Sequence, residues 1–189
     1  MKPFIILIFG LIFFSACNYR NNEITKVEFA TGGCFGSCPL TATSVDSSLH
    51  YKYYSGGIIP VWGNKPPKDD YNGYYTGTIS RGLWDSIIIK LNGIHYKQLD
   101  TVYNHSVDDE SFELIVHYRN GIKHIHAQSF SLPNNAREVF YWIANCYKSI
   151  KLKQIQDTLK FETTIQHPFN ARDFVQMPKG FRIKPPPTK

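Results

Sequence analysis

The stretch SFELIVHYRNGIKHIHA, residues 111–127, holds two alternating runs of apolar and polar residues around Asn120-Gly121. Alternation with a period of two is typical of strands that bury one face, and Asn-Gly as a two-residue loop is a strong hairpin signal. A loop made of these two residues sets a register in which His117 faces His124. The same register places Ile115 opposite His126.

This hairpin separates its side chains into two faces. The face predicted to be buried carries Phe112, Leu114, Val116, Tyr118 and Ile125. The other face carries Glu113, His117, His124 and His126. Imidazole nitrogens suit Zn or Cu(II), so the three histidines form a candidate metal site with the glutamate near enough to assist. The alternative is a polar outer face that happens to use histidine.

Further elements are predicted on both sides of the hairpin. Alternating runs favour strands at 24–29, 40–45, 49–54 and 74–79. Helical spacing follows Ser80 as far as Asn92-Gly93, and a second apolar stripe runs from Pro133 to Ile150. Because no β-α-β alternation appears, the predicted fold class is α+β. We expect an antiparallel sheet of about five to six strands with two helices packed on one face.

The first residues resemble a bacterial lipoprotein signal. Lys2 precedes an apolar run from Phe4 to Phe14, which is too short for a comfortable membrane span, and the run ends at Cys17. The resemblance implies cleavage before Cys17 and acylation of its thiol with palmitate-type chains. The lipid bilayer is then a partner, and the predicted location is the cell envelope, at the outer membrane. A plain secretory signal with a spare cysteine is the alternative.

Charge is distributed unevenly along the chain. Residues 17–150 hold twelve Lys or Arg and twelve Asp or Glu, whereas residues 151–189 hold eight against three. A neutral body argues against nucleic-acid binding, which needs a concentrated basic face. The predicted organisation is a signal peptide at 1–16, a tether at 17–23, one domain at 24–150 and a basic, proline-ending extension at 151–189. A long loop at 55–71 with exposed aromatic residues is a candidate contact surface.

Cys34 and Cys38 lie four positions apart between glycines. The chain must turn to bring them within disulfide distance, and Gly33 and Gly36 permit that turn. In an oxidising envelope we expect a disulfide. A redox-active pair, a soft-metal pair for Cu(I) or Zn, and two free thiols are the alternatives. Cys146 lies on the apolar stripe of the second helix and is predicted to be free and buried.

Several segments resemble a family of exported bacterial proteins, the domain-of-unknown-function family 6438. The resemblance rests on TGGCFGSCP at 31–39, NGYYTG at 72–77, Leu99-Asp100 with Tyr103, Asp108 or Asp109, and Pro133. It covers residues 24–150, with Thr41 where an aromatic residue is usual. The family has no assigned activity, so the resemblance implies fold and export without implying chemistry.

The predicted function is therefore a non-catalytic, membrane-anchored binding or envelope-associated domain whose partner is an envelope protein or a small ligand. The sequence has no HExxH, GxSxG or nucleophile–base motif, which favours a protein that is not an enzyme. Two alternatives stay open. One is binding of Cu or Zn by Cys34 and Cys38 or by His117, His124 and His126; the other is a thiol-disulfide redox protein.

Overall fold

The fold is known from a computed structural model that describes residues 23–32, 34, 38–58, 72–105 and 109–164. This part of the chain forms one eight-stranded sheet in the order β5-β7-β6-β1-β2-β3-β4-β8. The strands are β1 (Ile24–Gly32), β2 (Pro39–Asp46), β3 (His50–Ile58), β4 (Gly73–Thr78), β5 (Val102–Tyr103), β6 (Ser111–Tyr118), β7 (Gly121–Gln128) and β8 (Lys153–Ile155). The α-helices are α2 (Arg81–Gly93) and α3 (Asn134–Ala144), and the 3-10 turns are η2 (Ser129–Ser131) and η3 (Cys146–Ser149).

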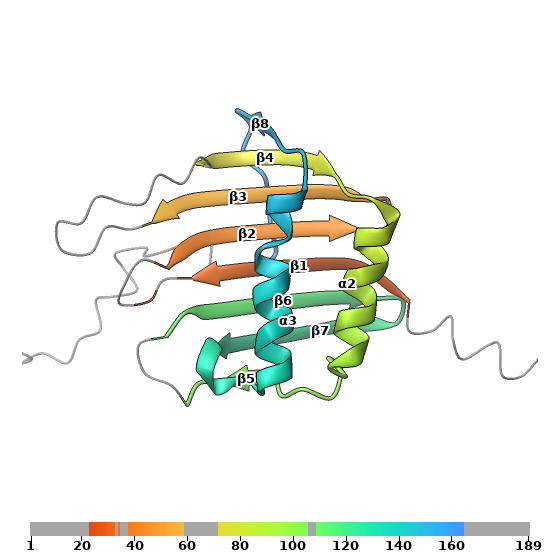
Figure 1. Cartoon of the computed structure of the whole chain (residues 1–189), viewed down its shortest axis with the longest axis vertical. Coiled ribbons are helices and arrows are strands. Elements are labelled where there is room, and N and C mark those ends of the chain that lie inside the picture. Colours follow the sequence, from red (N-terminus) through yellow and green to blue (C-terminus); the bar gives the residue numbers. More distant parts are fainter. Residues whose placement is uncertain (1–22, 33, 35–37, 59–71, 106–108, 165–189) are drawn as a thin grey trace, which may run out of the picture.

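The sheet is larger than predicted, and it is mixed. The two helices and the sheet fit the α+β class, but the expectation of five to six antiparallel strands was wrong. The short edge strand β5 pairs parallel with β7, and β8 adds a further strand beside β4. Both α-helices lie on the same face of the sheet (Figure 1). Helix α2 carries the chain from β4, near one edge, to β5 at the other, and this crossover delivers β5 parallel to its neighbour.

The two helices begin where the sequence indicates. The Ser80 side chain accepts a hydrogen bond from the Leu83 amide at 3.2 Å, as an N-cap residue does. Helix α3 begins directly after Pro133 but ends at Ala144 rather than reaching Ile150. The Asn145 side chain donates to the Tyr141 carbonyl oxygen at 2.7 Å, and the chain continues as the 3-10 turn η3.

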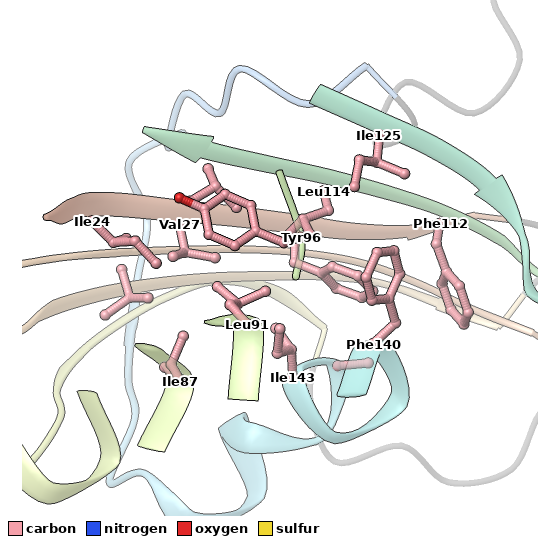
Figure 2. Close-up of a cluster of buried hydrophobic side chains, with 14 of the residues drawn as sticks. Ile24, Val27, Ile87, Leu91, Tyr96, Phe112, Leu114, Ile125, Phe140 and Ile143 are labelled. Atoms are coloured by element: carbon pink, nitrogen blue, oxygen red, sulfur yellow. The ribbon is translucent and has the colours of Figure 1, made fainter. Parts of the chain in front are cut away.

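The apolar core lies between the sheet and these helices. Figure 2 shows Phe112 and Leu114 of β6 on the same side as Phe140 of α3. The ring centroids of Phe112 and Phe140 are 6.0 Å apart, and both side chains are fully buried. Ile125 of β7 lies opposite Leu114 and is buried with it. The face of the 111–127 hairpin that was predicted to be buried is therefore the face that meets the helices.

The opposite face of the sheet is covered differently. After β8 the chain passes behind the sheet, on the side away from α2 and α3 (Figure 1). We call residues 156–164 the strap. Its last three residues reach β1 and β6, where the Glu162 amide meets Glu28 and the Thr164 amide meets Glu113. Residues that were assigned to a C-terminal extension therefore contact the middle of the sheet.

Candidate functional site: a buried glutamate beside two histidines

The hairpin of β6 and β7 has a different register from the predicted one. Tyr118 pairs with Gly121, so the two-residue loop is Arg119-Asn120. His117 therefore lies opposite Ile122 and not opposite His124. A shift of two residues along a ladder keeps every side chain on its face but changes its neighbours.

The glycine of the Asn-Gly pair lies beside the Tyr118 side chain and outside the two-residue loop. A Cβ atom at Gly121 would lie 2.9 Å from the Tyr118 hydroxyl oxygen, so the tyrosine side chain occupies the space that another side chain would need. Among the described glycines, Gly73 is the one with a positive φ, which means that Gly121 does not adopt the left-handed conformation of a primed turn. The Asn-Gly signal therefore located the hairpin but misplaced its loop by one position.

The corrected register brings Glu113 together with two of the three histidines. Glu113 lies directly opposite His126, and Ile115 lies opposite His124. The Glu113 Oε1 atom is 2.7 Å from His124 Nε2 and 3.8 Å from His126 Nε2. One candidate ligand atom from each residue lies within 4.8 Å of the other two. We call Glu113, His124 and His126 the Glu113 centre.

Burial differs sharply within the Glu113 centre. The Glu113 side chain is fully buried, whereas the side chains of His124 and His126 are 41% and 45% exposed. A buried carboxylate needs partners for both of its oxygens. The second oxygen, Oε2, accepts hydrogen bonds from the Thr164 amide at 2.6 Å and from the Thr164 hydroxyl at 3.1 Å. The strap thus holds one side of the carboxylate, and the histidines face the other.

His117 belongs to a neighbouring cluster. Its Nε2 atom lies 3.0 Å from Oε2 of Glu162 on the strap. A second buried glutamate, Glu28 of β1, lies 2.6 Å from the Lys26 ammonium, and its other oxygen accepts the Glu162 amide at 2.6 Å. Lys26 also contacts the Glu162 carboxylate at 2.7 Å. We call Glu28, Lys26, Glu162 and His117 the Glu28 centre.

The charges of the Glu28 centre stabilise one another. Burial alone lowers the pKa of Lys26, but its hydrogen bonds to Glu162 and Glu28 outweigh burial and raise the pKa above its ordinary value. The hydrogen bond from Lys26 is the largest effect on Glu162, and it lowers the pKa of that carboxyl. Lys26 therefore places a positive charge beside both carboxylates of this cluster, Glu28 and Glu162.

The Glu113 centre has the donor set of a transition-metal site. Two imidazole nitrogens and one carboxylate oxygen are ligands that Zn and Cu(II) accept, and three protein ligands leave a position open to solvent. Ligand atoms around tetrahedral Zn are about 3.3 Å apart, given bonds of about 2.0–2.1 Å. The observed distances of the Glu113 oxygen from the two imidazole nitrogens, 2.7 Å and 3.8 Å, lie on either side of that spacing.

The cysteines occupy separate places. Cys34 and Cys38 are joined in a disulfide with their Cα atoms 5.6 Å apart, within the usual range. Sulfurs paired in this way offer no thiolate to a metal. Cys146 is free and buried, and its burial raises the pKa of the thiol to about 12, which describes an inert core residue.

Several residues of the two centres were not identified from the sequence. Glu28 occupies a polar position of an alternating strand, which predicts exposure, yet it is 1% exposed. The strap helps to cover it, and the Glu162 amide that contacts it lies 134 positions away in sequence. Thr164 and Glu162 lie in a segment with no alternation or motif, so nothing in the neighbouring sequence predicts their contacts with the sheet.

Three predicted features fall outside the described residues: the lipidated Cys17, most of the 55–71 loop, and the chain beyond residue 164. Neither helix in the described chain has the length and apolar character needed to cross a bilayer. A family model, "Domain of unknown function (DUF6438)", matches residues 25–147. No curated protein matches the chain.

Proposed function

This chain belongs to the domain-of-unknown-function family DUF6438, and we propose that it is a non-catalytic, envelope-anchored domain that binds Zn or Cu(II). The Glu113 centre holds the metal through Glu113, His124 and His126. The observation that carries the proposal is a fully buried carboxylate with one oxygen facing two half-exposed imidazoles.

The electrostatics of the buried carboxylate support a cation at this point. Thr164 donates two hydrogen bonds to one oxygen of Glu113, and the other oxygen faces His124 and His126. A buried carboxylate is stable when a positive charge lies beside it. In the Glu28 centre Lys26 supplies that charge. In the Glu113 centre a divalent ion held by two neutral imidazoles would supply it.

Exposure of the histidines supports a site that exchanges its metal. The metal would contact solvent on the side of His124 and His126, because both imidazoles are nearly half exposed. A structural zinc site is normally closed by four protein ligands. Three ligands with an open position suit reversible binding or transfer of the ion.

Calorimetric titration of the folded protein with Zn and Cu(II) tests this function. We expect one site per chain, and we expect His124→Ala to weaken binding by at least about 100-fold, since a direct ligand is worth more than its supporting partners. His95→Ala, which changes an exposed histidine after α2, is the matched control and should bind normally. No heat from the wild type with either metal rejects the proposal.

The anchor is a separate part of the proposal. The lipoprotein-like signal supports acylation of Cys17 and attachment to the outer membrane, and a disulfide between Cys34 and Cys38 suits an oxidising compartment. Labelled palmitate should enter the wild type, and Cys17→Ser should abolish labelling and release the protein from membranes. A wild type that never takes up palmitate contradicts the anchor without affecting the metal site.

A further inference from the structure

We propose that docking of the strap and binding of the metal are coupled through Glu113, with Thr164 as the positioning residue. This inference rests on the proposed metal site and concerns its regulation. Thr164 acts through Glu113, because its amide and its hydroxyl both donate to Oε2 of that carboxylate.

The strap contacts the sheet through two matching hydrogen bonds. The Glu162 amide donates to Glu28 and the Thr164 amide donates to Glu113, each at 2.6 Å. Thr163 between them is 2% exposed. The end of the strap is therefore seated on two buried carboxylates rather than lying loosely over the sheet.

The docked strap fixes how Glu113 presents its oxygens. With Oε2 held by both the amide and the hydroxyl of Thr164, Oε1 is turned toward His124 at 2.7 Å. Release of the strap would remove both donors and let water reach the carboxylate. Part of the free energy of metal binding would then be used to order the Glu113 side chain, so the affinity for the metal would fall.

The coupling must operate in both directions. If the docked strap raises metal affinity by some factor, then the metal raises the stability of strap docking by the same factor. A metal bound to Oε1 and the two histidines holds the Glu113 carboxylate in the orientation that offers Oε2 to Thr164. Metal binding at the Glu113 centre would thus tighten the docking of the strap, the segment that leads into the C-terminal residues.

Three substitutions in the full chain test the role of Thr164. Thr164→Val removes the hydroxyl and keeps the amide, and we expect Zn binding to weaken by about 3- to 10-fold. Thr164→Pro removes both donors, and we expect a loss of about 10- to 100-fold, the range for partners that orient metal ligands. Thr164→Ser keeps both donors and should bind like the wild type. Thr158→Val, at an exposed strap position, is the matched control.

Hydrogen exchange separates coupling from general destabilisation. In the wild type, Zn should slow exchange of the amides of residues 162 and 164 by about the same factor by which Thr164→Pro weakens binding. His124→Ala should abolish that protection. Unchanged strap exchange on Zn binding, or equal Zn affinity in Thr164→Pro and Thr158→Val, overturns the coupling while the site itself stands. A wild type that binds no Zn overturns both proposals.

Discussion

Glu28 and Glu113 are two buried carboxylates on neighbouring strands of one sheet, yet they meet different partners. One oxygen of each carboxylate accepts a hydrogen bond of 2.6 Å from a strap amide. The other oxygen of Glu28 contacts Lys26, a permanent cation. The other oxygen of Glu113 contacts the imidazoles of His124 and His126 instead of a lysine. The same backbone arrangement thus produces a lysine ion pair in one centre and the proposed metal site in the other.

The largest expected effect comes from removing the permanent cation. Lys26→Met leaves Glu28 buried with only the Glu162 amide, and an unpaired buried charge is strongly destabilising. We expect the free energy of unfolding to fall by about 3 kcal/mol in urea denaturation. Lys52→Met, at an exposed position of β3, is the matched control and should change it by less than about 0.5 kcal/mol. Equal effects of the two changes would show that Lys26 does not balance Glu28.

A metal should stabilise the Glu113 centre by a slightly smaller amount. At free Zn of about 100 times the dissociation constant, linkage predicts a gain of about 2.7 kcal/mol in the free energy of unfolding. For a domain of this size that raises the melting temperature by roughly 5–10 °C. Lys26→Met should retain the zinc-dependent gain, and His124→Ala should lose it. A gain that survives His124→Ala would place the metal elsewhere.

The arrangement of the Glu28 and Glu113 centres could be predicted only in part from the sequence. Alternation in residues 111–127 correctly placed Glu113 and the histidines on one face, because a two-residue error in register does not change the face. The partners were missed because they depend on non-local pairing. Strands β5 and β8 have two and three residues, too few to show a period. The strap was predicted to be part of the basic, proline-ending extension, since nothing local indicates that its amides meet Glu28 and Glu113.

Acid should loosen the strap at the Glu28 centre. The hydrogen bond from Lys26 lowers the pKa of Glu162 below its ordinary value. A carboxyl with a depressed folded pKa stabilises the fold above its unfolded pKa, and that contribution disappears as pH falls through the folded pKa. Because Glu162 is nearly half exposed, the contribution is less than about 1 kcal/mol.

Glu162→Gln provides the measurement for that acid effect. The variant should be less stable than the wild type at about pH 7. The difference should begin to shrink near the ordinary carboxyl pKa of about 4.5 and vanish once the pH is below the depressed pKa of Glu162 in the folded state. Urea denaturation at both pH values without added metal gives the comparison. A difference that persists in acid would mean that the Glu162 charge does not hold the strap.

The smallest expected effect distinguishes the two centres through His117. This histidine contacts Glu162 at 3.0 Å and lies opposite Ile122, away from His124. His117→Ala should lower the free energy of unfolding by about 0.5 kcal/mol, the scale of a partly exposed contact with a carboxylate. It should leave Zn affinity unchanged in the same titration in which His124→Ala weakens binding by at least about 100-fold, because the observed register places His117 opposite Ile122 and in the Glu28 centre. If His117→Ala weakens Zn binding as much as His124→Ala does, all three histidines share one site. The distinction between Glu28, which is paired with a lysine, and Glu113, which is proposed to bind a metal, would then be wrong.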